Sequence, residues 1–318
     1  MNAHSSLHDV ATVTLNPAVD RTVSVADLTL GAVNRAELIG DRAGGKGVNV
    51  AAALAEQGHR AAALGFLGRE NAAIFEAFFA GQGVADRCLR LPGATRMGIK
   101  IVDPVRGETT DLNFPGLAPG AADLAALMRQ LDEIDARWCV LAGSLPPGVE
   151  TDFYAQAIRR LTARGVRVAL DTSGDALAEA IATGPEVIKP NVHELAALVG
   201  RELADEAAVV AAARDLIAGG VGLVAVSRGA DGAVFVTADE VVTARPPAIA
   251  VRSTVGAGDA MVAGIVAARL RGLSLAESAR LATAFSLFAL SRGAAAPVAG
   301  DPRAAVAAFA ERVEVGAR

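Results

Sequence analysis

The stretch Thr254-Val255-Gly256-Ala257-Gly258-Asp259 leads directly into apolar residues at helical spacing, which predicts a helix over 259–270. Its glycines would open that helix and place Asp259 in the first turn. Backbone amides at a helix N-terminus attract anions. The segment therefore suits a transferring phosphoryl group, with Asp259 taking the proton of an attacking hydroxyl. An ordinary helix cap at Asp259 fits the same pattern equally well.

A second glycine-rich segment, Gly44-Gly45-Lys46-Gly47-Val48-Asn49, also leads into a predicted helix, which ends near residue 58. It is not a Walker P-loop, because Lys46 is followed by glycine rather than Ser or Thr. The glycines let backbone amides approach a ligand, and Lys46 and Asn49 add a cation and an amide. Taken alone, the segment fits a helix-entry turn with a solvated lysine better than an anion site.

Between and beyond these segments, short apolar strands alternate with helical patterns. Such alternation predicts an α/β fold with a mostly parallel sheet and helices on both faces. The predicted strands are 61–67, 138–142, 166–171, 187–189 and 223–227, and the predicted helices are 71–80, 152–163 and 206–218. The C-terminal third is predicted to be helical over 259–270, 275–290 and 303–313.

Two regions, about 20–40 and 95–114, break this alternation. The second contains two predicted strands, 97–102 and 109–114, joined by a turn at 103–107. The turn is too short for a crossover helix, so the two strands should pair antiparallel. The two regions would form a small sheet that acts as a lid, although an ordinary edge hairpin fits equally well. No linker or repeat divides the chain, so 1–318 is expected to be a single domain with this lid.

Composition narrows the class of protein. The chain has 318 residues, of which 52% are hydrophobic, and a net charge of −5 without any Lys/Arg run. These features predict a large core and no nucleic-acid partner. No apolar run of membrane-spanning length occurs, so we expect a cytoplasmic protein without a membrane partner. Cys88 and Cys139 lack metal or redox spacing and are expected to be free thiols.

One segment imitates a dinucleotide-binding fingerprint. The run 220–225 reads GVGLVA, which matches the glycine pattern. It precedes a predicted strand, whereas the fingerprint follows a strand and opens a helix. We therefore reject an unrelated dinucleotide-binding protein.

Several segments in fixed order identify a family. They are Leu15-Asn16-Pro17-Ala18-Val19-Asp20, Gly44–Asn49, Thr95-Arg96, Gly143-Ser144-Leu145-Pro146-Pro147-Gly148, Lys189-Pro190-Asn191-Val192-His193-Glu194, Ser227-Arg228-Gly229-Ala230-Asp231-Gly232 and Thr254–Asp259. Together they resemble the phosphofructokinase B family of carbohydrate kinases, within the ribokinase-like superfamily, over residues from about 10 to 315. The resemblance implies a three-layer α/β/α sandwich with a small β-sheet lid and an ATP-dependent sugar-phosphate kinase.

The resemblance also implies roles for individual residues. Asp259 would be the catalytic base, and the backbone of Gly256, Ala257, Gly258 and Asp259 would hold the transferred phosphate. The sugar would contact Asn16, Asp20, Gly45, Lys46, Asn49 and Ser144, and its phosphate would meet Arg96. Lys100 should face the same way as Arg96, because it follows by even spacing on one strand.

The nucleotide and its ion have their own expected residues. ATP would contact Lys189, Ser227, Gly229, Gly232 and Thr254, and its adenine would rest against the C-terminal helices at Ala284 and Ser291. Mg²⁺ would be associated with Asn191 and Glu194, by direct contact or through water. A helix cap made by the same two residues is compatible with this role.

Within the family, the Leu-Asn-Pro-Ala opening and the Ser-Thr-Val-Gly-Ala-Gly-Asp spelling are most similar to the 1-phosphofructokinase branch, which implies fructose 1-phosphate as substrate. The 6-phosphofructokinase branch has an additional arginine on the second lid strand, and 110–114 contains none. Tagatose 6-phosphate and fructose 6-phosphate remain alternative substrates. A non-catalytic sugar-phosphate sensor is disfavoured by the intact Asp259. A homodimer could form through the lid.

Overall fold

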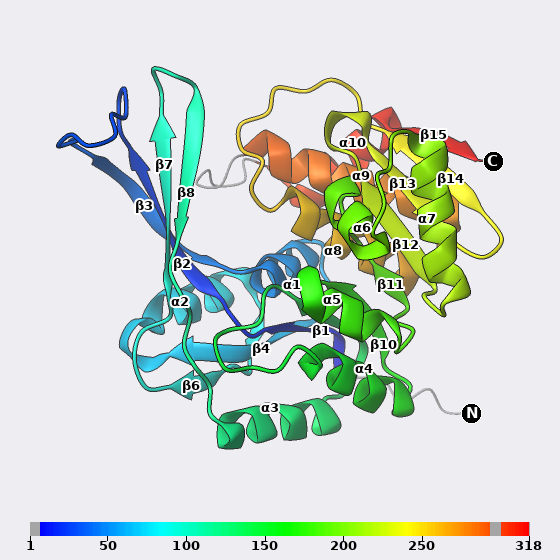
Figure 1. Ribbon diagram of the computed structural model, residues 1–318, viewed down its shortest axis with the longest axis horizontal. Helices are drawn as coiled ribbons and strands as arrows, with labels where there is room; N and C mark the ends of the chain where they lie inside the picture. Colours follow the sequence, from blue (N-terminus) through cyan, green and yellow to red (C-terminus); the bar gives the residue numbers. More distant parts are fainter. Residues whose placement is uncertain (1–6, 293–299, 318) are drawn as a thin grey trace.

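The computed structural model describes residues 7–292 and 300–317, and its centre is a large mixed sheet (Figure 1). The strand order is β15-β14-β13-β12-β11-β10-β9-β1-β4-β5, with β6 also paired to β4. The strands from β12 to β5 run parallel and the three beyond β12 run antiparallel. Their bounds are β1 His8–Thr14, β4 Ala61–Gly68, β5 Ala85–Asp86, β6 Leu89–Leu91, β9 Ala136–Ala142, β10 Arg167–Asp171, β11 Val187–Ile188, β12 Leu223–Ser227, β13 Ala233–Val236, β14 Val241–Arg245 and β15 Glu314–Ala317.

Helices cover both faces of this sheet, because its central strands are apolar on both sides. In β1, Val10 belongs to one buried core and Ala11 to the other. The first core includes residues of α1 (Lys46–Glu56), α2 (Ala73–Gln82), α8 (Ala257–Arg271), α9 (Leu275–Arg292) and α10 (Pro302–Arg312). The second includes residues of α3 (Ala121–Glu133), α4 (Phe153–Ala163), α5 (Gly174–Ile181), α6 (Val192–Val199) and α7 (Glu206–Ala218). The predicted three layers are confirmed, with element ends within a few residues.

A separate four-stranded sheet, the small sheet, stands at one side of the main sheet (Figure 1). Its order is β3 (Glu37–Gly44), β2 (Ala18–Ser24), β7 (Met97–Asp103) and β8 (Glu108–Asn113). The predicted antiparallel pairing of the last two strands is confirmed, while β2 and β7 pair in parallel. Two chain segments that are distant in sequence therefore share one sheet.

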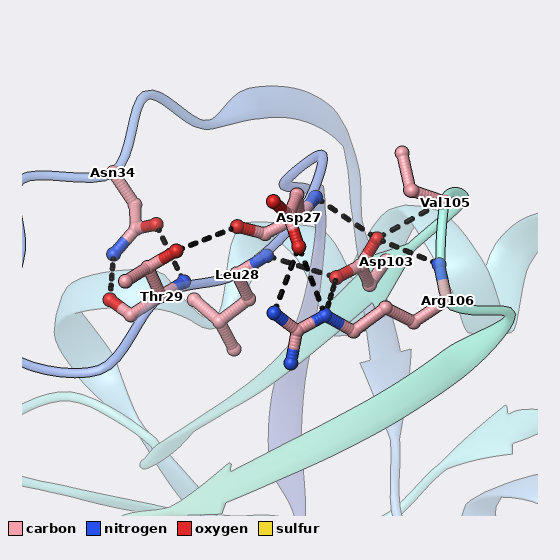
Figure 2. A network of polar contacts seen from close by, with 7 residues as sticks. All are labelled: Asp27, Leu28, Thr29, Asn34, Asp103, Val105 and Arg106. Atoms are coloured by element: carbon pink, nitrogen blue, oxygen red, sulfur yellow. Dashed lines mark hydrogen bonds and ion pairs between the residues drawn. The ribbon is translucent and has the colours of Figure 1, made fainter.

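The tip of the small sheet is fastened by one carboxylate, as Figure 2 shows. Asp103 accepts hydrogen bonds from the backbone N–H groups of Asp27, Leu28, Val105 and Arg106, at 2.9–3.2 Å. Burial alone would raise the pKa of Asp103, but these donors hold it at about 2. The Arg106 guanidinium adds an ion pair to Asp27. The loop after β2 is thus tied to the turn between β7 and β8.

No helix in the described part of the chain is both long and apolar enough to cross a membrane. The cysteines Cys88 and Cys139 are both free.

Helices α8 and α9 approach each other closely at Gly264. A Cβ at Gly264 would lie 2.6 Å from the Ala282 Cα. Gly264→Ala should therefore lower the free energy of unfolding by about 1–3 kcal/mol through overpacking. Urea denaturation measures this change.

Gly81→Ala is the matched control, because a Cβ there meets no atom within 4 Å. It should leave stability unchanged or raise it by up to ~1 kcal/mol, since alanine is the better helix former. Equal effects of the two substitutions would contradict the account.

Candidate active site

Two glycine-opened helices meet at the carboxylate of Asp259. Gly256 precedes α8 with φ 78°, a left-handed conformation that suits glycine. Asp259 follows in the first turn and is only 8% exposed. Asn49, in the first turn of α1, donates from Nδ2 to its Oδ2 at 2.7 Å. This bond joins the two segments that the sequence singled out.

A buried charge cluster lies beside Asp259. Asp171, at the carboxyl end of β10, has a side chain only 1% exposed. Lys46 Nζ lies 3.2 Å and Lys189 Nζ 3.6 Å from its Oδ1. Lys189 also reaches under the start of α8, because a Cβ at Gly258 would lie 3.3 Å from its Nζ. Asp171 was not among the residues predicted from the sequence, although its place at the end of a predicted parallel strand was the available signal.

The cluster sets the acidity of the candidate base. Burial, followed by the negative charge of Asp171, raises the pKa of Asp259 to about 6, against the opposing effects of Asn49, Lys46 and Lys189. A carboxylate with a pKa near neutrality is suited to proton abstraction at physiological pH. Burial would lower the pKa of Lys46, but Asp171 and Asp259 raise it, so Lys46 stays a cation.

A cavity of about 340 Å³ opens between the small sheet and the start of α8. Its lining includes Asp20, Arg42, Asn49, Lys100 and Gly256. Burial raises the pKa of Asp20, while the surrounding cations Arg96, Lys100 and Arg42 oppose the shift. Arg42 was not among the predicted residues. The cavity therefore combines the half-buried carboxylate of Asp20 with several positive groups.

The predicted sugar contacts cluster beside this cavity. Arg96 donates to the Asn16 carbonyl oxygen at 3.3–3.4 Å and to Asn113 Oδ1 at 3.4 Å. Asn16 Nδ2 donates to Ser144 Oγ at 3.1 Å. Lys100 pairs with Asp111 on the next strand. Gly45 has φ 130° and packs closely against Thr14 and Pro17, so the backbone geometry and packing alone account for a glycine at this position.

A second cavity, of about 680 Å³, lies on the other side of the start of α8. Four of the predicted nucleotide residues line it, namely Ser227, Gly229, Gly232 and Thr254. The segment Thr254–Gly258 separates the cavities: Val255 and Gly256 face the first, and Thr254, Ala257 and Gly258 face the second. The N-terminus of α8 therefore lies where the two cavities approach each other.

The predicted adenine contacts Ala284 and Ser291 do not line the second cavity. In the described part of the chain, the α9 residues that line the second cavity are Thr283, Ser286, Leu287 and Leu290. These residues share one face of the helix, since they recur at helical spacing. Ala284 lies one residue round the helix and is fully buried in the core. Ser291 instead donates to the Phe288 carbonyl oxygen. The loop 246–251 completes the wall and carried no sequence signal.

Asn191 and Glu194 form a reciprocal helix cap. Glu194 N donates to Asn191 Oδ1 at 2.8 Å, and Asn191 N donates to Glu194 Oε2 at 2.9 Å. Among the described residues, no group of three or more His, Cys, Asp or Glu side chains is arranged to hold a metal ion. A metal at this site would therefore depend on oxygen ligands from water and substrate.

Comparison with known proteins agrees with this geometry. Residues 13–299 match the family model described as pfkB family carbohydrate kinase. The chain belongs to this family. The similarity spans both cavities and nearly the whole main sheet, so the carbohydrate kinase fold and enzyme class expected from the sequence are confirmed.

Relatives of this pfkB kinase include the 1-phosphofructokinase of Rhodobacter capsulatus, 56% identical over 88% of this chain and 90% of that protein. Phosphofructokinase-2 from Escherichia coli in complex with substrates and products has a TM-score of 0.88 at 31% identity, covering 94% and 99% of the two chains. The tetrameric inhibited form of that enzyme has a TM-score of 0.87 at 30% identity, covering 96% and 99%.

The raised pKa of Asp259 predicts how stability depends on pH. Well below pH 3.8 the carboxyl is protonated in both folded and unfolded protein. As the pH rises from about 4 to about 6 the carboxyl ionises more readily in the unfolded protein than in the folded one, so this ionisation lowers stability over that range. Asp259→Asn removes this ionisation. The variant should be more stable than wild type at pH 8, by about 1–3 kcal/mol, and the difference should shrink toward pH 4. Urea unfolding at both pH values measures it.

The same variant lacks the proton acceptor, so kcat should fall by roughly 10²–10⁴ with little change in KM. Asp239→Asn, in an exposed turn, is the control and should change neither property. A normal kcat in Asp259→Asn would rule out its role as base.

Proposed function

We propose that this protein transfers the γ-phosphoryl group of ATP to the 6-hydroxyl of D-fructose 1-phosphate, giving ADP and D-fructose 1,6-bisphosphate. The observation that carries the proposal is the meeting of two cavities at the glycine-opened start of α8, where Asp259 is buried. Relatives named 1-phosphofructokinase favour this sugar phosphate.

The chemistry needs one proton acceptor and stabilisation of negative charge. Asn49 holds Asp259 Oδ2, and the other carboxylate oxygen takes the proton of the sugar 6-hydroxyl. The backbone amides at Ala257, Gly258 and Asp259 face the γ-phosphate at the helix N-terminus. Lys46 adds positive charge from the Asp171 cluster. Positioning and electrostatics carry most of the catalysis in phosphoryl transfer.

The sugar lies in the smaller cavity and ATP in the larger. Asp20 accepts hydrogen bonds from sugar hydroxyls, and Arg96 with Lys100 recognises the 1-phosphate. The second-strand segment 110–114 has no arginine, which favours fructose 1-phosphate over fructose 6-phosphate. The small sheet acts as a lid that excludes water from the phosphoryl acceptor.

Mg²⁺ accompanies the nucleotide in this proposal. Asn191 and Glu194 are committed to their helix cap, so they would hold the ion through water while the phosphates supply direct ligands. The ion would neutralise charge on the β- and γ-phosphate oxygens. We propose a cytoplasmic location, because ATP and sugar phosphates are available there and free thiols such as that of Cys88 persist there.

The kinetic test compares phosphorylated and free sugars in wild type and Arg96→Ala. Fructose 1-phosphate should give the highest kcat/KM among fructose 1-phosphate, fructose 6-phosphate, tagatose 6-phosphate and free fructose. Arg96→Ala removes a bidentate phosphate contact, so the ratio of kcat/KM for fructose 1-phosphate over fructose should fall roughly 10²-fold. A coupled ADP-release assay measures it.

Arg201→Ala, at a half-exposed arginine paired with Asp215, is the control and should keep the wild-type ratio. If Arg96→Ala also keeps it, Arg96 does not read the phosphate. A higher kcat/KM for tagatose 6-phosphate would replace the proposed substrate.

We also propose a homodimer through the small sheet. Lys100 lines the cavity, so Ile99 and Ile101 project from the opposite face, together with Leu112, the cross-strand partner of Ile99. Leu38 pairs with Val23 on that same face. Leu112 is 46% and Leu38 59% exposed, and a second copy would cover this apolar face.

Leu112→Asp places a charge in that face and should convert the dimer into monomer, because an unpaired charge is costly to bury. Sedimentation velocity distinguishes the two. A wild type that sediments as a monomer would contradict the dimer.

A further inference from the structure

Arg42 occupies a position that joins the small sheet to the reaction centre. It lies on β3 directly opposite Asp20 on β2, so the two side chains project from the same face of the small sheet. That face borders the smaller cavity, and Arg42 lines it together with Asn49, Val255 and Gly256. A cation of the small sheet thus faces the start of α8.

The charges around Arg42 come from four elements. Burial and Arg292 lower its pKa, while Asp20, Glu56 and Asp259 oppose that shift. Arg292, on α9, is itself held by Glu56 of α1 at 2.8–2.9 Å. Asp20 belongs to β2 and Asp259 to α8. Arg42 remains charged in this half-buried place, between the sugar-side carboxylate and the candidate base.

Arg96 has different charged neighbours from Arg42. Asp20 is the one carboxylate whose charge acts noticeably on Arg96, and Arg96 donates to Asn16 and Asn113. Arg42, by contrast, interacts electrostatically with both Asp20 and Asp259. A phosphosugar whose phosphate meets Arg96 would present its far end, with the reacting hydroxyl, toward Arg42 and Asp259.

We propose that Arg42 is a catalytic residue that contacts the transferring phosphoryl group from the side of the small sheet. This inference rests on the proposed function. The new bond joins the sugar 6-oxygen to the γ-phosphorus, and the bond from that phosphorus to the β-phosphate oxygen breaks. The hydroxyl proton passes to Asp259, and Arg42 keeps its own protons and donates N–H hydrogen bonds to the phosphoryl oxygens.

The geometry gives this contact a second consequence. A guanidinium matches a phosphoryl group with two parallel N–H donors. Because Arg42 sits on the lid, its charge would be fully in place only when the lid has closed over the sugar. Transfer to water in the absence of sugar would then be slow, as in other enzymes whose closure completes the site.

The test compares Arg42→Ala and Arg42→Lys with wild type at saturating ATP. Arg42→Ala should lower kcat by roughly 10²–10³-fold, in the range of arginines that stabilise phosphoryl transfer. The KM for fructose 1-phosphate should stay within about threefold, because the contact forms mainly in the transition state. Arg42→Lys should recover at least tenfold of the lost kcat. Arg160→Ala, on α4 and paired with Asp132, should behave as wild type.

A second measurement isolates the transition state. Isothermal titration with ADP, aluminium fluoride and fructose 1-phosphate should show wild type trapping the complex and Arg42→Ala failing to, while both bind ADP equally. A raised KM with unchanged kcat would make Arg42 a sugar-phosphate contact and overturn the proposal. Normal trapping by Arg42→Ala would also overturn it, even if the variant is less stable.

The proposed substrate is tested separately, by turnover in wild type. If another phosphosugar proves better, the same comparison of kcat and KM is made with that sugar. The result for the Arg42 variants then does not depend on which phosphosugar is the substrate.

Discussion

The hydrogen bond from Asn49 to Asp259 is the contact on which the site depends. It joins α1, which follows directly from the small sheet, to α8, which separates the two cavities. Each helix begins at glycines, so backbone amides and the bonded side chains converge on one point. A shift of either helix would break this bond and change the position of the smaller cavity relative to the larger one. The two glycine-rich segments, more than 200 residues apart, are one structural unit.

Burial of charge is the cost of this arrangement. Asp259 and Asp171 are both nearly inaccessible, and the negative charge of Asp171 opposes the ionisation of Asp259. Lys46 and Lys189 offset part of that cost by pairing with Asp171. Asp171 therefore serves two purposes: it fixes the lysines and it raises the pKa of the candidate base. A site without the negative charge of Asp171 would have less buried charge to compensate, but its Asp259 carboxylate would be less basic.

The sequence predicted the layers and both glycine-opened helices, because hydrophobic period and glycine position are local properties. It also placed Arg96 and Lys100 on one strand face. Asp171 and Arg42 were missed because their importance comes from distant partners: Asp171 acts through Lys46 and Lys189, and Arg42 through Asp20 and Asp259. The predicted adenine contacts Ala284 and Ser291 each lie one residue from a position on α9 that lines the larger cavity, because a single step round a helix turns a side chain away from the cavity. Side-chain direction on a helix buried on several sides depends on packing that the sequence does not display.

Alternation along the small sheet links its two faces. Lys100 faces the cavity, and Ile99 and Ile101 face away from it on the same strand. Asp103 ties the tip of that strand to the loop after β2, so the two chain segments of the small sheet are joined at its tip as well as along β2 and β7. A partner packed on the apolar face would therefore restrict the distance between the start of α8 and the side chains of Lys100, Asp20 and Arg42. Because phosphoryl transfer depends on the position of charges to within about 1 Å, assembly and catalysis would be coupled through the backbone of this one sheet.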